Sequence, residues 1–311
     1  MFRRSFCRLL AITQVLLLLS LAGGVQAGAS GEASTAPNLA SVSAAVAYLD
    51  DGELLVNKHA ERSVPIASIT KLMTALVVLD SGEPLDEWLE FYPRHQAASA
   101  NAYTRIRVGS TLRRGDMLRI ALMSSENFAA YTLARHHPGG FDAFVAAMND
   151  KARALGMSHT HFVDPTGLST DNRASAGDLV RLARAAAADE RLRQYSTTVT
   201  FEGRFRQPRY RLLFGNTNVL VNRGNWSVAL SKTGYLDEAG RCLVMVSEMQ
   251  GREVVTVLLD SFGTRSPLGD AGRIRRWLAT GETGQVAGAA RDYEQRRNAH
   301  YAAAAQDRKV H

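Results

Sequence analysis

Cysteine and lysine are scarce in this sequence of 311 residues. Two cysteines occur, and Cys7 lies in an N-terminal segment that we expect to be removed, so the processed chain keeps only Cys242 and cannot form an intrachain disulfide. Five lysines stand against 32 arginines. Arginine stays protonated in proteins, whereas lysine can lose its proton. The few positions that keep lysine are therefore candidates for proton-transfer chemistry.

Dense runs of basic residues are also lacking. The formal net charge is +7, and three of these charges, from Arg3, Arg4 and Arg8, belong to the N-terminal segment. The other basic residues are spread along the chain without an RNA- or DNA-binding fingerprint. We therefore expect no nucleic-acid partner. A basic exported protein is expected to meet an acidic surface or polymer instead.

The N-terminus has the pattern of a secretory signal peptide. "MFRRSFCR" is basic, "LLAITQVLLLLSLAGG" is apolar and "VQA" supplies the small residues of a cleavage site, which predicts a signal peptide over residues 1–27. The alternative is an uncleaved anchoring helix, since the apolar run is near the lower length limit for spanning a bilayer. Because no cysteine follows the run, a lipoprotein anchor is not expected. We predict an exported protein without a permanent membrane anchor and with a flexible linker over residues 28–38.

The hydrophobic pattern predicts an α/β (α+β) fold, with an antiparallel sheet built from both ends of the chain and an inserted helical subdomain. Residues 41–58 suit a β-hairpin that turns at Asp51-Gly52. Helical patterns cover 68–80, 114–123, 127–137, 140–155, 175–188 and 270–281. Strand patterns cover 227–235, 241–249 and 253–261. We expect the folded domain to span 39–281 and the charged, Ala-rich residues 282–311 to be a mobile tail.

The stretch "PIASITKLMTAL" places Lys71 among apolar residues, three positions after Ser68. Residues at i and i+3 of a helix share a face and can touch. At the helix start, free N–H groups and the positive end of the dipole disfavour a protonated Lys71, as does burial. A neutral Lys71 could take the proton of Ser68, whose own amide could donate to an oxyanion. The simpler alternative is a capped helix with a lysine that reaches solvent.

A second lysine, Lys232, begins the triplet Lys232-Thr233-Gly234 on a predicted strand. A lysine and a hydroxyl there could hold an anionic group, and Gly234 would let a substrate backbone approach closely. A substrate lying antiparallel to this strand would receive a hydrogen bond from the amide of Tyr235, a second oxyanion donor.

The pattern Ser-x-Asn occurs at Ser99–Asn101 and at Ser125–Asn127. The second copy interrupts the apolar helical stretch "LRIALMSSENFAAYTLA", where a polar break needs a reason. A hydroxyl and an amide at this point could bridge the two lysines and hold a peptide backbone, so we prefer Ser125 and Asn127 as site residues.

In this order, Ser68-x-x-Lys71, Ser125-x-Asn127 and Lys232-Thr233-Gly234 resemble the three motifs of the penicillin-recognising serine enzymes. Stretches such as "ASITKLMTALVVLDSG", "SAGDLVRLA" and "LSKTGYLDEAGRCLVM" are similar to the low-molecular-mass D-alanyl-D-alanine peptidases of family S11, from about residue 40 to 280. "SSEN", "HHPGGFDAFVAAMN" and the early end of the chain resemble most their endopeptidase branch, the penicillin-binding protein 7 type. The resemblance implies a β-lactamase/transpeptidase-like fold.

The resemblance also implies the reaction. Ser68 would be the nucleophile and Lys71 its base, while Ser125 and Lys232 would pass a proton to the leaving amine. An endopeptidase of this kind forms an acyl-enzyme on a D-alanine carbonyl and so cuts peptidoglycan cross-links between stem peptides, without metal or organic cofactor. It implies a periplasmic location and covalent inhibition by β-lactams.

Binding roles follow from the same resemblance. Asn127 would contact a substrate amide, Lys232 and Thr233 would bind the carboxylate of a β-lactam, and the amides of Ser68 and Tyr235 would form the oxyanion hole. Between Asn127 and Lys232 the glutamates are Glu190 and Glu202, and neither has the sequence context of a β-lactamase deacylating glutamate. We therefore expect a long-lived acyl-enzyme.

Three alternatives stay open. The protein could be a D-alanyl-D-alanine carboxypeptidase, or a non-catalytic peptidoglycan-binding module that keeps the fold. A metallopeptidase would need ligands such as His159, His161 and Asp164, which have a suitable spacing but suit a polar loop better.

Overall fold

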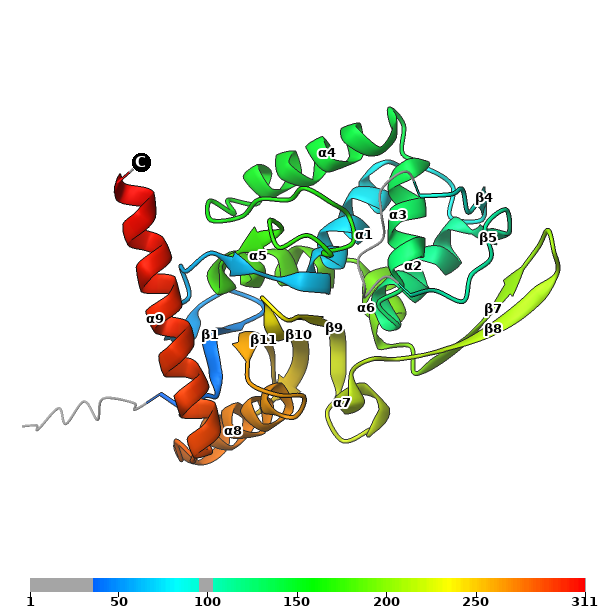
Figure 1. Cartoon of the computed structure of the whole chain (residues 1–311). Helices are drawn as coiled ribbons and strands as arrows, with labels where there is room; N and C mark the ends of the chain where they lie inside the picture. The colour runs from blue at the N-terminus through cyan, green and yellow to red at the C-terminus, as the bar shows by residue number, and fades with distance from the viewer. Residues whose placement is uncertain (1–35, 95–102, 311) are drawn as a thin grey trace, which may run out of the picture. The chain divides into compact units, whose positions relative to one another are not determined.

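A computed structural model describes residues 36–94 and 103–310 (Figure 1). The predicted signal peptide, most of the predicted linker and the Ser99–Asn101 copy of Ser-x-Asn lie outside these residues. Within the described part, no helix has the length and apolar character needed to cross a bilayer.

A five-stranded antiparallel sheet has the strand order β2-β1-β11-β10-β9. The N-terminal hairpin of β1 (Ser41–Tyr48) and β2 (Leu54–Lys58) joins the C-terminal strands β9 (Val228–Leu236), β10 (Gly240–Met249) and β11 (Arg252–Ser261) through the β1–β11 pairing. The predicted sheet from both chain ends is therefore confirmed. At its edge lies β9, the strand that carries Lys232-Thr233-Gly234.

Both faces of the sheet are covered because successive side chains point to opposite sides. Ala45 and Ala47 of β1 pack in the core with α1 (Lys71–Asp80) and α5 (Ala176–Ala187). Ala44 and Val46 pack with α8 (Ser266–Thr280) on the other face. This two-sided burial explains why residues 44–47 of β1 are all apolar instead of alternating with polar residues.

The helical subdomain lies between the two sheet-forming ends of the chain. It contains α2 (Arg114–Met123), α3 (Asn127–Arg135) and α4 (Gly140–Ala154), as the sequence predicts. Two short antiparallel strand pairs accompany these helices: β3 (Val64–Pro65) with β6 (Arg173–Ala174), and β4 (Trp88–Glu90) with β5 (Thr111–Arg113).

The segment that follows α5 contains one helix, one hairpin and one helical turn. These are α6 (Glu190–Thr197), the hairpin of β7 (Thr200–Phe205) and β8 (Tyr210–Gly215), and α7 (Val219–Asn222). Figure 1 shows the β7–β8 hairpin reaching away from the five-stranded sheet toward β4 and β5.

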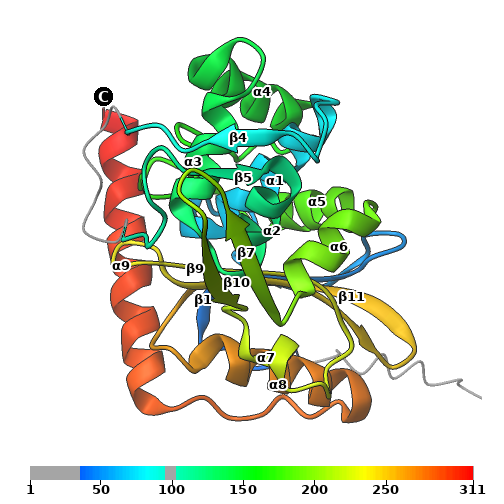
Figure 2. The same cartoon turned by 90° about the vertical axis from the view of Figure 1, so that its right-hand side faces the viewer.

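The C-terminal segment differs from its prediction. Instead of a mobile tail over 282–311, the structure has helix α9 (Gly288–Val310), which runs along one side of the domain in Figure 2. Its side chains Tyr293, Arg297 and Tyr301 recur every four residues and all bond the buried carboxylate of Asp260. The packing face is aromatic and cationic, so the sequence shows no aliphatic stripe that would predict a docked helix.

Candidate active site

Ser68 lies in the 3-10 turn η1 (Ala67–Thr70) that leads directly into α1, and Lys71 is the first residue of that helix. The Lys71 Nζ atom lies 2.9 Å from Ser68 Oγ, 2.7 Å from Asn127 Oδ1 and 2.6 Å from the carbonyl oxygen of Thr166. The side chain does not reach solvent, because Lys71 is 1% exposed. The amine is thus held against the serine hydroxyl.

Burial lowers the pKa of Lys71 to about 7, although the carboxylates of Asp164 and Glu126 partly oppose this shift. Desolvation disfavours a charged amine, and three oxygens around Nζ do not replace bulk water. Near neutral pH a large fraction of Lys71 is therefore unprotonated. An unprotonated amine in contact with a hydroxyl can act as its general base.

Ser125 and Asn127 lie at the junction of α2 and α3, where the chain breaks between two buried helices. Ser125 has a φ of 59°, a left-handed conformation that is uncommon outside glycine and occurs at functional sites. Its hydroxyl accepts a hydrogen bond of 2.9 Å from Lys232 Nζ. Burial, with a smaller contribution from the charge of Lys71, holds the pKa of Lys232 well below its usual range. The pair can accept and pass on a proton.

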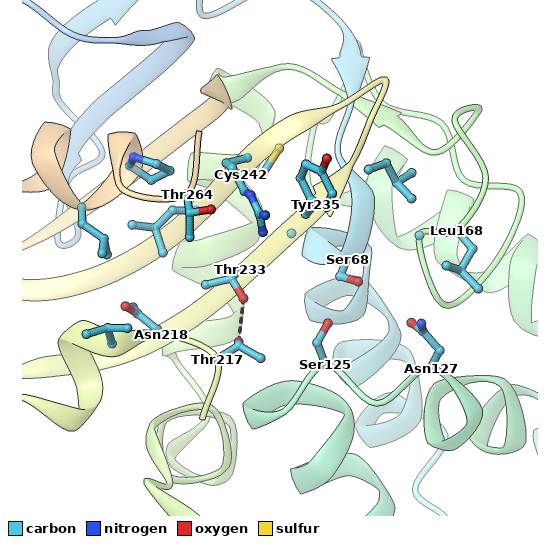
Figure 3. A pocket seen from close by; sticks show the side chains of 18 residues that line it. Ser68, Ser125, Asn127, Leu168, Thr217, Asn218, Thr233, Tyr235, Cys242 and Thr264 are labelled. Carbon is cyan, nitrogen blue, oxygen red and sulfur yellow. Dashed lines mark hydrogen bonds between the residues drawn. The ribbon is translucent and has the colours of Figure 1, made fainter. Parts of the chain in front are cut away.

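Strand β9 closes the other side of the site. Lys232 is buried, and Thr233 Oγ1 lies 2.6 Å from Thr217 Oγ1 (Figure 3). A Cβ on Gly234 would come within 3.0 Å of the carbonyl oxygen of Ile66. The absence of a side chain at 234 lets the strand lie directly against the turn of Ser68, and Tyr235 follows at the rim, 42% exposed.

A cavity of about 330 Å³ opens between these elements. In Figure 3 the side chains of Ser68, Ser125 and Asn127 lie opposite those of Thr217 and Thr233 across this space. The structure thus brings together the eight residues singled out by the sequence, on η1, α1, the α2–α3 junction and β9.

Other groups of the site escaped the sequence analysis. Thr217 and Asn218 line the cavity, and Asn218 donates to the hydroxyl of Ser231. Gly167, with a φ of 78°, brings its loop so close that a Cβ would overlap the carbonyl oxygen of Ala67. The turn-forming residues Asp, Pro and Gly in "DPTGLS" are the signal that could have indicated this loop.

The residues considered for a zinc site do not gather. His159 Nδ1 lies 3.2 Å from a carboxylate oxygen of Glu61, and His161 pairs through its backbone with Arg173. The Asp164 carboxylate accepts the backbone N–H groups of its own loop. Among the residues that the structure describes, no group of three or more His, Cys, Asp or Glu is placed to hold a metal ion.

Comparison with known proteins agrees with this geometry. Residues 30–263 match the peptidase S11 family, described as D-alanyl-D-alanine carboxypeptidase. The chain is 46% identical to a D-alanyl-D-alanine endopeptidase of Pseudomonas aeruginosa over 94% of both chains, and 44% identical to one of Escherichia coli over 93% of this chain and 94% of the relative.

Solved structures give the same fold. The Streptomyces K15 DD-transpeptidase is similar with a TM-score of 0.72 and 25% identity, covering 79% of this chain and 99% of that one. Penicillin-binding protein D2 of Listeria monocytogenes, in its ampicillin-bound form, has a TM-score of 0.67 and 28% identity, covering 78% and 98%. The predicted fold class is confirmed. The extent of the family match and the identity to the two endopeptidases show that this chain belongs to the peptidase S11 family.

Proposed function

We propose that this protein is a serine D-alanyl-D-alanine endopeptidase that hydrolyses D-alanyl cross-links of peptidoglycan through an acyl-enzyme on Ser68. The observation that carries the proposal is the contact between Lys71 Nζ and Ser68 Oγ, at 2.9 Å, with the pKa of Lys71 lowered to about 7. Acyl transfer to a serine requires a base within hydrogen-bond distance of the hydroxyl, and this contact provides it.

In the acylation step, Ser68 Oγ attacks the carbonyl carbon of a D-alanine while its proton passes to Lys71 Nζ. Negative charge develops on the carbonyl oxygen, between the backbone amides of Ser68 and Tyr235. The C–N bond then breaks, and the proton that Lys71 took from Ser68 passes to the leaving amine through Ser125 and Lys232, which lie 2.9 Å apart. Water hydrolyses the resulting ester and regenerates the serine.

Substrate binding is assigned to the remaining groups. The hydroxyl of Thr233, in contact with Thr217, faces the cavity and suits a carboxylate. Asn127 accepts from Lys71 through Oδ1 and is proposed to offer its amide nitrogen to a peptide carbonyl of the substrate. Strand β9 at the sheet edge is proposed to pair with the substrate backbone, as an added strand does.

We propose that residues 1–27 are a cleaved signal peptide and that the enzyme works in the periplasm, where it meets the stem peptides of peptidoglycan. β-Lactams are proposed to acylate Ser68 and to leave slowly, since neither Glu190 nor Glu202 lines the catalytic cavity.

The test is digestion of purified cross-linked muropeptide dimers by the processed protein, with products identified by mass spectrometry. Dimers that fall to monomers support the endopeptidase. Dimers that survive but lose a terminal D-alanine indicate a carboxypeptidase, and dimers that are bound but unchanged indicate a binding module.

The matched control is Ser68→Ala. This variant should neither cut dimers nor be labelled by a fluorescent penicillin, while its far-UV circular dichroism stays that of the parent. Persistent labelling would refute the assignment of the nucleophile.

A further inference from the structure

A second cavity, of about 880 Å³, lies along the β7–β8 hairpin, apart from the catalytic residues. Its lining is strongly cationic, with two acidic side chains, Asp116 and Glu202, against five arginines. We call this cavity the arginine groove and define it by those arginines, which are Arg113, Arg204, Arg206, Arg209 and Arg211. Four of these arginines lie within residues 204–211, at the turn of the hairpin, a local concentration of basic residues that the sequence analysis did not single out.

The hairpin sets two of these charges against each other. Arg204 and Arg211 are directly opposite in the β7–β8 register. Like charges at opposed positions destabilise a sheet. A single carboxylate, Glu202, lies 3.3 Å from each of the two arginines, whose side chains are 74% and 66% exposed. One carboxylate does not neutralise two guanidinium groups, so the pair costs stability and leaves positive charge for an external anion.

Two further arginines lie against an aromatic ring where the hairpin meets β4 and β5. The guanidinium carbon of Arg206 lies 3.7 Å from the ring centre of Trp88, and that of Arg113 lies 5.4 Å from it. The backbones of Arg206 and Thr111 exchange hydrogen bonds of 3.1 and 2.9 Å, which tie the hairpin to β5. The backbone that carries Arg206 is therefore held in place against β5.

The inner face of the hairpin anchors it to the domain. Phe205 is buried, stacks on Tyr210 and lies 6.1 Å from Phe91, ring centre to ring centre. Phe214 is buried on the same face. Since period 2 along each strand sends the arginines Arg204 and Arg211 to the other side, the hairpin is apolar inward and cationic outward.

The groove also connects with the catalytic cavity through the chain. Strand β8 ends at Gly215, and Thr217 and Asn218, directly after it, line the catalytic cavity. The base of the hairpin therefore lies beside the catalytic cavity, and a polymer bound at both places would extend along the hairpin. A small substrate would use the cavity alone.

We propose that the arginine groove binds carboxylates of a peptidoglycan strand, at a position outside the bond that is cut. The inference rests on the proposed function, which supplies a polymeric substrate whose stem peptides carry free carboxylates. Guanidinium groups bind carboxylates through paired, charge-assisted hydrogen bonds, which lysines cannot reproduce. The groove serves to hold the polymer while the catalytic cavity selects the bond.

The test measures binding of purified, lipid-free sacculi to the Ser68→Ala protein, by co-sedimentation at low and raised salt. The substitution pair Arg204→Gln and Arg211→Gln should weaken binding roughly tenfold or more, because charge-assisted hydrogen bonds are lost. Raised salt should weaken the parent more than this double variant, because exposed charges are screened. Sacculi whose carboxylates have been amidated should bind the parent as weakly as unmodified sacculi bind the double variant.

The matched control is Arg153→Gln with Arg191→Gln, which removes the same charge from two exposed arginines, 72% and 51% accessible, outside the groove. It should bind sacculi within twofold of the parent. The melting temperature of the groove variant should not fall, because the repulsion between Arg204 and Arg211 is removed, and this separates lost binding from lost folding.

Equal binding by the groove variant and the parent would overturn the proposal, as would an equal loss in the control. Retained affinity for amidated sacculi would also overturn it. If binding to phosphatidylglycerol vesicles falls while binding to sacculi does not, the groove serves a membrane surface and the proposal is wrong. Because the assay uses an inactive protein, it does not depend on whether dimers are cut, and the proposed function fails or stands by product analysis alone.

Discussion

A Cβ atom on Gly234 would lie 3.2 Å from the backbone nitrogen of Ser68. The backbones of strand β9 and of the turn that carries Ser68 are therefore in contact. A side chain at position 234 would increase the distance between them. The two amides proposed as oxyanion donors, those of Ser68 and Tyr235, flank this contact. The distance between strand and turn thus fixes the size of the oxyanion site.

The first prediction is that Gly234→Ala slows acylation by a fluorescent penicillin roughly 10²-fold, the typical effect of losing one oxyanion donor. The added methyl must push β9 away from η1, because it would meet backbone atoms that cannot rotate aside. Stopped-flow measurement of the acylation rate checks this. Gly272→Ala on α8 is the control, since a Cβ there meets nothing within 4 Å; equal rates for the two variants would contradict the prediction.

The pH dependence of acylation follows from Lys71. Its pKa of about 7 lies below the ordinary lysine value of 10.5, so the fraction of neutral amine rises as the pH rises through 7. The acylation rate should therefore rise between pH 6 and 8 and level off above, as roughly expected for a base of that pKa. Because Lys232 lies near enough for the charge of Lys71 to lower its pKa, the midpoint belongs to the coupled pair.

Lys71→Arg is the companion variant for this profile. It keeps the positive charge but cannot give up a proton, so acylation should be lost at every pH between 6 and 9. Near-normal acylation by Lys71→Arg would exclude Lys71 as the proton acceptor, and a parent profile that is flat across this range would do the same.

A third prediction concerns Asn127, whose Oδ1 accepts from Lys71 Nζ at 2.7 Å. Asn127→Asp places a carboxylate at this distance and favours the charged amine, so the midpoint of the acylation profile should move upward by roughly 1–3 pH units. Asn298→Asp on α9, where the oxygen accepts from Arg62, makes the same chemical change and should leave the midpoint in place. If the midpoint does not move in Asn127→Asp, the rise of the acylation rate with pH is not set by the ionisation of Lys71.

The sequence predicted the sheet and the main helices because their apolar periodicity is strong and their ends carry turn residues. Helices α2, α4 and α5 lie within one residue of the expected ranges at each end. Helix α6 was missed, since its stretch "ERLRQYST" has few apolar residues and depends on the cap from Asp189. Helix α9 was missed because its docking depends on Asp260, a distant buried carboxylate.

The sequence predicted the parts of the site that are formed by side chains. It did not predict the parts that are formed by backbone atoms. Ser68, Lys71, Asn127 and Lys232 are recognisable by residue type and spacing. The carbonyl oxygen of Thr166, which accepts from Lys71 at 2.6 Å across 95 positions of sequence, has no signature because every residue has a carbonyl. Long-range contacts of this kind come only from the fold.

The last prediction concerns the C-terminal helix. Asp260 has no exposed side-chain surface, and Arg297 Nε lies 2.6 Å from its Oδ2 atom. Removing one partner of a buried ion pair leaves an uncompensated charge, so Arg297→Met should lower the free energy of unfolding by about 3 kcal/mol. Arg296→Met, an exposed neighbour on the same helix, should stay within about 0.5 kcal/mol of the parent. Urea denaturation followed by circular dichroism gives both values. If the two variants were equally stable, α9 would contribute little to the fold, and the expectation of a tail that is not part of the domain would be correct after all.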